Sequence, residues 1–230
     1  MNLKDISPHW FWLPFGLLAA MIVARYFLSE ETYQYYIAER EYGLVEWLQP
    51  VMLLPGILFG LLALRLWPQL PTLQARAWIL IVTLGAFYMM GEEISWGQWI
   101  FMWDTPEYML EHNKQHETNL HNASSWFNQK PRVLLELWVL IGAIRSGLRA
   151  YKNKPDEIGT TSYWFWPTQP LAWTGVLAML AMMPERITDW WGILPPFPFD
   201  IDAAEAQELV LAVLLTLFLA SVWTRLRSMK

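Results

Sequence analysis

The chain has 230 residues and a net charge of −5, and 55% of its residues are hydrophobic whereas only 16% are charged. An ordinary soluble domain carries about 25% charged residues, so this composition excludes that class and indicates a protein that crosses a membrane several times. The absence of cysteine excludes disulfides, thiolate metal sites and cysteine nucleophiles. We expect a single integral membrane domain, residues 1–230, with short loops.

Six apolar segments are long enough to cross a bilayer as helices, which takes about 20 residues each. They lie at residues 11–28, 44–66, 77–98, 132–149, 170–187 and 207–224. The first lacks the basic start and short core of a cleavable signal, so we expect it to stay as a helix. The second contains Pro50 and Pro55, which predict a kink within a membrane helix. The sequence therefore predicts an all-α, polytopic transmembrane bundle of about six spanning helices.

Lysine and arginine residues predict the orientation, because they are enriched in cytoplasmic loops. With a cytoplasmic N-terminus, ten of these residues fall on the inner side and five on the outer side, and Arg25 lies near the outer end of the first span. Both termini are therefore expected to be cytoplasmic. Acidic residues have the opposite bias, since only Asp5, Asp156 and Glu157 fall on the inner side.

Two adjacent carboxylates, Glu92 and Glu93, occur at the outer end of the third predicted span. Glu92 lies 16 residues after Arg76, which marks the inner end of that span. At about 1.5 Å per residue this is roughly 24 Å into a hydrocarbon core about 30 Å thick. An unpaired carboxylate is costly at that depth, and negative charge is also disfavoured at the C-terminal end of a helix. Both residues are therefore expected to have polar partners or a functional role.

The residues around this pair predict a helix that continues outward through residue 98. On such a helix Glu92 shares a face with Trp96, which is four residues further on. Gly91 and Gly97 are then expected to let another helix approach closely.

Other predicted spans bring carboxylates to a similar depth, and together they predict an acidic pocket beneath the outer surface. Four glutamates are the candidate catalytic residues: Glu92, Glu93, Glu136 and Glu185. Further polar residues are expected at the same site: Gln98, Asn119, Asn122, Arg186, Asp189, Glu205 and Glu208. For Glu46, Glu205 and Glu208, near the starts of helices, the alternative is a carboxylate that complements the helix dipole.

The outer loop between the third and fourth predicted spans contains three of the four histidines. Thr105, followed by Pro106 and Glu107, predicts the start of a short surface helix with Thr105 as its N-cap. Histidines or carboxylates four residues apart can hold one metal ion, so a divalent metal is a candidate cofactor. Its expected ligands are Glu92, Glu93, Glu117 and His121. Hydrogen bonding or simple solvation of the loop is the alternative, and we expect the loop to cover Glu92 and Glu93.

The stretch GEEISWGQ, followed by TPE and then ETNLHN, resembles a family of uncharacterised bacterial polytopic inner-membrane proteins. The likeness covers residues 91–122, with a weaker similarity at the acidic start of the last span. It implies a multi-pass protein of the bacterial inner membrane and no particular chemistry.

Three functions are open at this point. The first is a hydrolase or transferase, with or without a metal, that acts on a lipid-linked substrate near the periplasmic face. Zinc hydrolases of the ceramidase and adiponectin-receptor type carry an HxxxH pair on a spanning helix, whereas the only such pair here, His112 and His116, lies in a loop. The second is a non-enzymatic accessory subunit that binds lipid or partner membrane proteins.

The third function is a proton- or cation-linked transporter, because intramembrane carboxylates commonly mark ion pathways. The inner halves of four predicted spans are nearly all apolar, which favours a site open to one side. Nucleic acid is excluded as a partner, because the basic residues are scattered along the inner membrane edge.

Overall fold

A computed structural model describes residues 3–38, 43–113, 116–120, 123–152 and 157–229, and these residues form helices and no strands. The helices are α1 (Trp12–Phe27), α2 (Glu30–Tyr33), α3 (Leu44–Arg65), α4 (Leu73–Glu93), α5 (Gln98–Phe101), α6 (Glu107–His112), α7 (Ser125–Tyr151), α8 (Thr161–Phe165), α9 (Gln169–Ala181), α10 (Met183–Trp191) and α11 (Ala203–Arg227). The predicted all-α fold class is confirmed.

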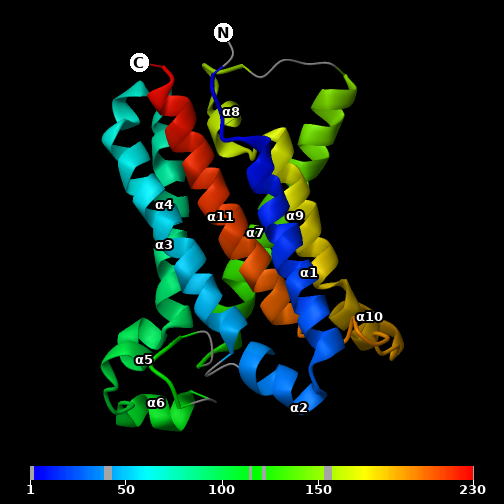
Figure 1. The fold of residues 1–230 in the computed structure, drawn as a ribbon. Helices are drawn as coiled ribbons and strands as arrows, with labels where there is room; N and C mark the ends of the chain where they lie inside the picture. Colours follow the sequence, from blue (N-terminus) through cyan, green and yellow to red (C-terminus); the bar gives the residue numbers. More distant parts are fainter. Residues whose placement is uncertain (1–2, 39–42, 114–115, 121–122, 153–156, 230) are drawn as a thin grey trace.

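The long helices run alternately in opposite directions along one bundle (Figure 1). Helices α1, α4 and α9 run away from the end that carries both termini, and α3, α7 and α11 return to it. We call this end, which also holds α8, the terminal end. The opposite end, which holds α2, α5, α6 and α10, is called the loop end.

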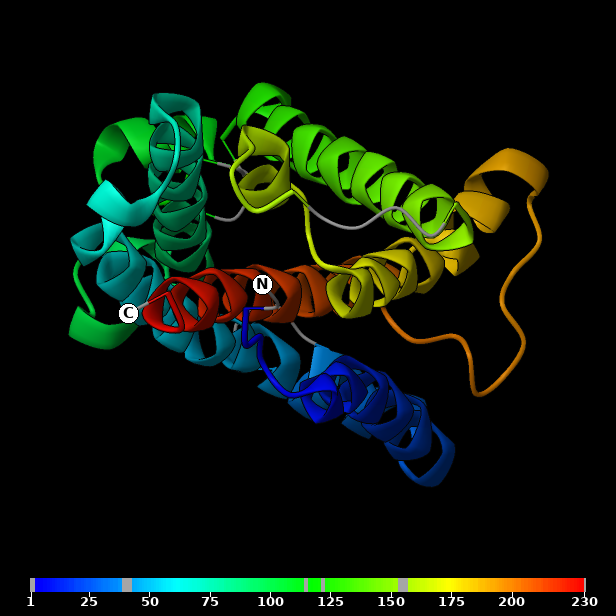
Figure 2. The same ribbon diagram turned by 90° about the horizontal axis from the view of Figure 1, so that it is seen from above.

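Helix α11 is the core of the bundle, with the other long helices around it (Figure 2). In its most apolar 18-residue window 83% of the residues are buried, against 39% in α3, 28% in α4 and 17% in the segment Pro8–Phe27 that contains α1. Because α11 is apolar on all sides, every face of it can pack against a neighbour. The surrounding helices instead direct one apolar face outward.

Four helical segments are long and apolar enough to cross a membrane: Pro8–Phe27, Leu44–Arg65, Leu73–Glu93 and Ala203–Arg227. On α3, the exposed residues Leu54, Leu58 and Leu61 follow one helical face at the outside of the bundle. A soluble monomer rarely exposes such large apolar surfaces. The fold is therefore compatible with a membrane protein.

One predicted span is not a single helix. Over residues 170–187, α9 ends at Ala181 and α10 begins at Met183, with Pro184 in its first turn. Proline has no N–H to donate to the preceding turn and its ring clashes with that turn, so a helix stops or bends before it. Helix α10 accordingly leaves the bundle at the loop end (Figure 1).

Helix α3 runs without a break through Pro50 and Pro55. Its close packing on α11 depends on Gly56, because a Cβ at this position would lie only 2.9 Å from the Cα of Thr216. The hydroxyl of Thr216 donates a 2.6 Å hydrogen bond to the carbonyl of Met52. This contact fixes α3 against the core helix.

Candidate functional site

Helix α4 ends at Glu93 because the chain makes a left-handed turn directly after it. The φ angles are 46° at Ser95, 56° at Trp96 and 103° at Gly97, so the prediction of a helix through residue 98 is wrong. A Cβ at Gly91 would lie 2.8 Å from the folded-back indole of Trp96. Gly91 and Gly97 therefore serve this turn, and the predicted approach of another helix at these glycines is also wrong.

Glu92 is held by two donors that this turn and the outer loop supply. The side chain is 4% exposed. Its carboxylate accepts hydrogen bonds from the indole of Trp96 at 2.7 Å and from the backbone N–H of Leu120 at 2.8 Å. Leu120 belongs to the loop between α4 and α7, so the prediction that this loop covers the two glutamates is confirmed for Glu92. For Glu93 it is not, because no described loop residue makes a hydrogen bond to its carboxylate.

Glu117, an expected metal ligand, lies in a buried hydrogen-bond network within the loop. Its carboxylate accepts from the hydroxyl of Ser95 at 2.8 Å and from the side-chain amide of Asn119. The side-chain oxygen of Asn119 in turn accepts a 2.8 Å bond from the amide of Asn113. The network ties the loop to the turn after α4, which explains why these polar residues are buried together.

Gln98 ties the same loop at a second point. Its amide oxygen accepts from the N–H of Thr118 at 2.7 Å, and its amide nitrogen donates to the hydroxyl of Thr105 at 2.8 Å. The hydroxyl of Thr105 donates to the carbonyl of His116 and caps no helix. The prediction of Thr105 as N-cap is wrong, because α6 has Pro106 in that position.

A pocket with a volume of about 540 Å³ lies between α4 and α7, with α11 at its base and α8 near one end. Its lining residues recur every three or four positions on each helix, as one helical face requires. They are Trp78, Ile81, Val82, Gly85, Tyr88, Met89, Glu92 and Glu93 from α4; Pro131, Arg132, Leu134, Leu135, Trp138 and Ile141 from α7; Phe165 and Trp166; and Glu208, Leu211 and Leu215 from α11.

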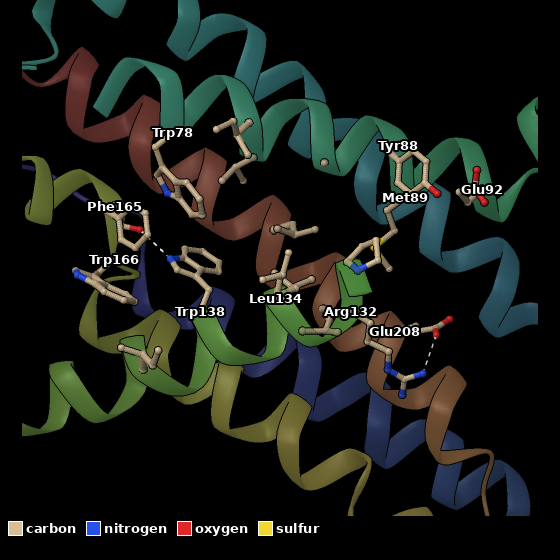
Figure 3. A pocket seen from close by; sticks show the side chains of 18 of the residues that line it. Trp78, Tyr88, Met89, Glu92, Arg132, Leu134, Trp138, Phe165, Trp166 and Glu208 are labelled. Atoms are coloured by element: carbon tan, nitrogen blue, oxygen red, sulfur yellow. Dashed lines mark hydrogen bonds and ion pairs between the residues drawn. The ribbon is translucent and has the colours of Figure 1, made fainter. Parts of the chain in front are cut away.

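The two ends of this pocket differ in chemistry (Figure 3). Trp78, Trp138 and Phe165 gather at one end, whereas Arg132 and Glu208 lie at the other. The wall between these ends is apolar. Several apolar lining residues are exposed at the side of the bundle, which opens the pocket toward the surroundings: Ile81, Leu134 and Ile141.

Glu93 differs from the other carboxylates of this region. It lines the pocket, is half-buried, and makes no hydrogen bond or ion pair with any residue that the structure describes. It interacts electrostatically with four other carboxylates: Glu208, Glu205, Glu46 and Glu92. Glu93 is therefore the lining carboxylate that no described residue engages.

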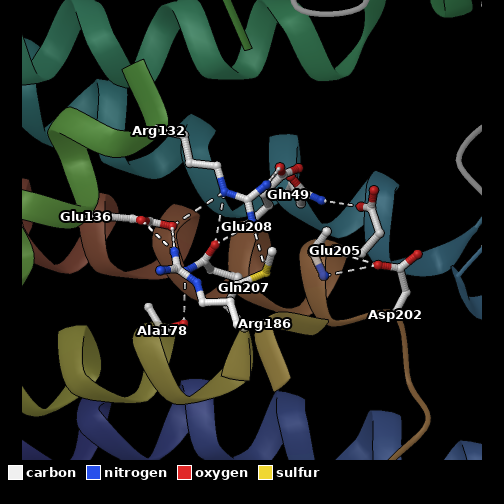
Figure 4. A network of polar contacts seen from close by, with 11 residues as sticks. Gln49, Arg132, Glu136, Ala178, Arg186, Asp202, Glu205, Gln207 and Glu208 are labelled. Carbon is white, nitrogen blue, oxygen red and sulfur yellow. Dashed lines mark hydrogen bonds and ion pairs between the residues drawn. The ribbon is translucent and has the colours of Figure 1, made fainter. Parts of the chain in front are cut away.

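Arg132 organises the charged end of the pocket (Figure 4). Its guanidinium group lies 3.3 Å from Glu208 and 3.6 Å from Glu136, and its Nε donates a 3.0 Å bond to the side-chain oxygen of Gln207. Arg186 donates to both carboxylate oxygens of Glu136, at 2.9 and 2.8 Å. The network joins α7, α10 and α11, and it leaves Glu136 paired with two arginines beside the pocket.

Glu205 belongs to a separate contact between α3 and α11. Its carboxylate accepts a 2.9 Å hydrogen bond from the amide of Gln49 (Figure 4). It also lies in the first turn of α11, where Asp202 caps the helix by accepting from two backbone N–H groups. This position matches the dipole-complementing alternative.

The predicted site residues are thus brought together only in part. Glu92, Glu93 and Glu208 share the pocket, and Glu136 and Arg186 flank it. The remaining described candidates do not line it: Gln98, Glu117, Asn119, Glu185, Asp189 and Glu205. His121 and Asn122 lie outside the described residues.

Within the described part of the chain, no three histidine or carboxylate side chains form a group that could hold a metal ion. Glu117 is engaged by Ser95 and Asn119, and it lies in the loop network instead of the pocket. Metal binding with His121 as a ligand stays a prediction.

Two features of the site were not expected from the sequence. Arg132, at the first residue of the predicted span 132–149, was counted only among the five outer basic residues that predict the orientation, because an arginine near a helix end usually extends to the membrane interface. The aromatic end of the pocket joins Trp78, Trp138 and Phe165, which are far apart in the sequence. Tryptophans near the ends of spans are normally interfacial anchors, so no local signal marked them.

Comparison with known proteins identifies no relative: no family model, no curated protein and no solved structure matches the chain.

Proposed function

We propose that this protein is an integral membrane protein that binds a lipid-like molecule in the pocket between α4 and α7. The single observation that carries the proposal is the asymmetry of the pocket, which is apolar along its length and charged at one end. An acyl chain suits the apolar wall. A head group that donates hydrogen bonds suits the Glu93 carboxylate, which no described residue engages.

The length of the pocket supports a lipid chain as the occupant. On α4 its lining extends from Trp78 to Glu93, a distance of about 22 Å at the rise of an α-helix. Each leaflet of a bilayer provides about 15 Å of hydrocarbon. The exposed residues at the side of the pocket give such a chain a direct route from the bilayer.

The membrane placement in this proposal has six crossings, made by α1, α3, α4, α7, α9 and α11, with both termini in the cytoplasm. The alternating helix directions and the shared end of the two termini support it (Figure 1). The distribution of lysine and arginine supports a cytoplasmic terminal end. The loop end then faces the periplasm, and the family resemblance supports a bacterial inner membrane.

A second candidate function is a hydrolase or transferase that acts on a lipid-linked substrate, with Glu93 as general acid or base. The observation in its favour is that Glu93 faces the pocket whereas Glu92 and Glu136 are held by protein partners. General acid–base chemistry needs a side chain within hydrogen-bond reach of the reacting group, and the Glu93 carboxylate is the one in the pocket lining that no described residue engages. The metal-assisted form of this chemistry depends on His121.

Two further alternatives have weaker support. A transporter needs a polar route to the terminal end, but the described pocket ends there in Trp78, Trp138 and Phe165. The exposed apolar faces of the helices are consistent with an accessory subunit that binds partner membrane proteins. Such a function does not explain the pocket between α4 and α7 or its charged end.

The lipid proposal is tested by photo-crosslinking. The purified protein is placed in nanodiscs that contain a phospholipid with a photoactivatable acyl chain, and crosslinked peptides are mapped by mass spectrometry. We expect enrichment at Ile81, Leu134 and Ile141, which line the pocket. Crosslinks spread evenly over the outer face of α3 would contradict a specific pocket.

A pocket-filling variant gives this experiment a matched control. A Cβ at Gly85 would meet no atom within 4 Å, so Gly85→Phe introduces a ring at a position that lines the pocket and has open space for its Cβ. Gly16→Phe introduces the same ring on α1, where the space is equally open. Gly85→Phe should lose the crosslinks of the pocket, whereas Gly16→Phe should keep them.

The catalytic candidate is tested through Glu93→Gln. Lipid extracts from cells that express the native protein, Glu93→Gln or the exposed-residue control Glu111→Gln are compared by mass spectrometry. A change in lipid composition that needs Glu93 but not Glu111 supports catalysis. Identical extracts, with crosslinking retained in Glu93→Gln, would leave a binding protein and reject the chemistry.

A further inference from the structure

A second, smaller pocket lies at the terminal end, where residues of α7, α9 and α11 meet those that follow α8. Its volume is about 110 Å³, which is room for roughly four water molecules. Its polar lining is rich in arginine: Arg145, Ser146, Arg149, Thr168, Gln169 and Arg225. The size suits one small anionic group, and three of the lining residues carry guanidinium groups that can donate hydrogen bonds to it.

Arg225 is the central observation. It is 1% exposed, and its Nε and Nη1 donate to the backbone carbonyls of Ser221 at 3.3 Å and Tyr163 at 3.2 Å. Its Nη2 is buried and has no hydrogen-bond partner. Among the described residues no carboxylate pairs with this guanidinium group. A buried cation without an anionic partner is costly, and a bound anion would remove that cost.

The start of α9 is an independent observation at the same pocket. Thr168 is the N-cap of this 13-residue helix, but its side chain makes no capping bond. The hydroxyl oxygen of Thr168 is buried and has no hydrogen-bond partner. The first N–H groups of a helix lack partners within it, and with the helix dipole they favour an anion. The hydroxyl and the helix start thus offer donors to the same anion as Arg225.

Arg145 and Arg149 complete the lining from α7, where they lie four residues apart on one face. Arg145 is oriented by a 2.7 Å hydrogen bond to the hydroxyl of Ser162. The planar fork of arginine matches the oxygens of a phosphate group. We propose that this pocket binds a phosphate group, either the head group of an anionic phospholipid or inorganic phosphate. The proposal is independent of the lipid pocket at α4 and α7.

The first test measures the melting temperature of the purified full chain in a neutral detergent. Sodium phosphate is titrated while sodium chloride keeps the ionic strength constant. The native protein should be stabilised by about 2–4 °C at saturation, because a ligand that binds only the folded state stabilises it. An equal effect of chloride and phosphate would overturn the proposal.

Substitutions of the lining residues test whether the stabilisation by phosphate arises from binding in this pocket. Arg225→Gln and Arg149→Gln should each raise the half-saturating phosphate concentration by about tenfold, the effect of losing one charged hydrogen bond. Thr168→Val should raise it by a smaller factor. The control Arg227→Gln removes an exposed arginine that lies over the Trp223 ring on the same helix, and it should leave the value unchanged.

Arg149→Gln and Thr168→Val decide the result if Arg225→Gln does not fold. Phosphate stabilisation that is unchanged in both would overturn the proposal. The source of the phosphate is then resolved in nanodiscs of a phosphate-free glycolipid, with and without phosphatidic acid. If the lipid head group is the occupant, phosphatidic acid raises the melting temperature and abolishes the effect of inorganic phosphate. If inorganic phosphate is the occupant, its effect persists in both nanodiscs.

Discussion

The indole nitrogen of Trp96 donates a 2.7 Å hydrogen bond to the carboxylate of Glu92, although the helix that contains Glu92 has already ended. The left-handed turn at Ser95, Trp96 and Gly97 returns the indole over the last turn of α4. The backbone conformation of the turn and the partner of a buried carboxylate are therefore coupled.

Trp96→Phe removes the indole N–H and keeps an aromatic ring over Gly91. We expect the free energy of unfolding to fall by about 1.5–3 kcal/mol, because the buried carboxylate of Glu92 loses a donor. Reversible unfolding in mixed micelles measures the change. Trp47→Phe, at an exposed residue of α3, is the control and should change it by less than about 0.5 kcal/mol. Equal losses in the two variants would show that the hydrogen bond does not stabilise the fold.

Gly97→Ala tests the turn itself. An alanine with φ of 103° is strained, and its Cβ would lie 3.2 Å from the side chains of Phe101 and Trp103. We expect a loss of about 1–3 kcal/mol in the free energy of unfolding. Gly16→Ala, in open space on α1, should instead stabilise the helix by about 0.5–1 kcal/mol. The same sign of change at both positions would contradict the left-handed conformation.

Gly56→Ala tests the packing of α3 on α11. The added Cβ would lie 2.9 Å from the Cα of Thr216, and a backbone atom cannot be displaced without moving α11. The expected destabilisation is about 1–3 kcal/mol by overpacking, measured by the same unfolding assay. Gly147→Ala on α7 has open space around its Cβ and serves as the comparison. A neutral Gly56→Ala would mean that the two helices are less closely packed.

The ion pair between Arg132 and Glu208 is tested by a double-mutant cycle of Arg132→Gln and Glu208→Gln. The two groups are 3.3 Å apart and mostly buried, so we expect a coupling energy of about 1–3 kcal/mol. The exposed Lys130→Gln, combined with Glu208→Gln, gives the reference cycle and should show no coupling. Additive losses in the first cycle would show that Arg132 is held by its other partners alone.

The sequence indicated which polar residues lie at the ends of the spans predicted to be outer, and the structure shows why only some of them meet. Glu92 was expected to be covered by the loop, and Leu120 does so through its backbone N–H. That contact could be anticipated because an uncovered carboxylate at this depth is costly. Glu117 was expected beside it as a metal ligand, but Ser95 and Asn119 engage it within the loop. The partners of side chains in a loop could not be predicted from the sequence, because a loop has no regular residue spacing of the kind that a helix has.

From the sequence alone, the all-helical class, the apolar segments and the unusual acids at the end of α4 could be determined. These are local properties, because hydropathy over about 20 residues decides whether a helix is apolar. Only the tertiary structure decided that Glu93 faces a pocket and that Arg132 joins Glu136 to Glu208. These features depend on how helices pack side by side and on one left-handed turn, and no periodicity in the sequence encodes either.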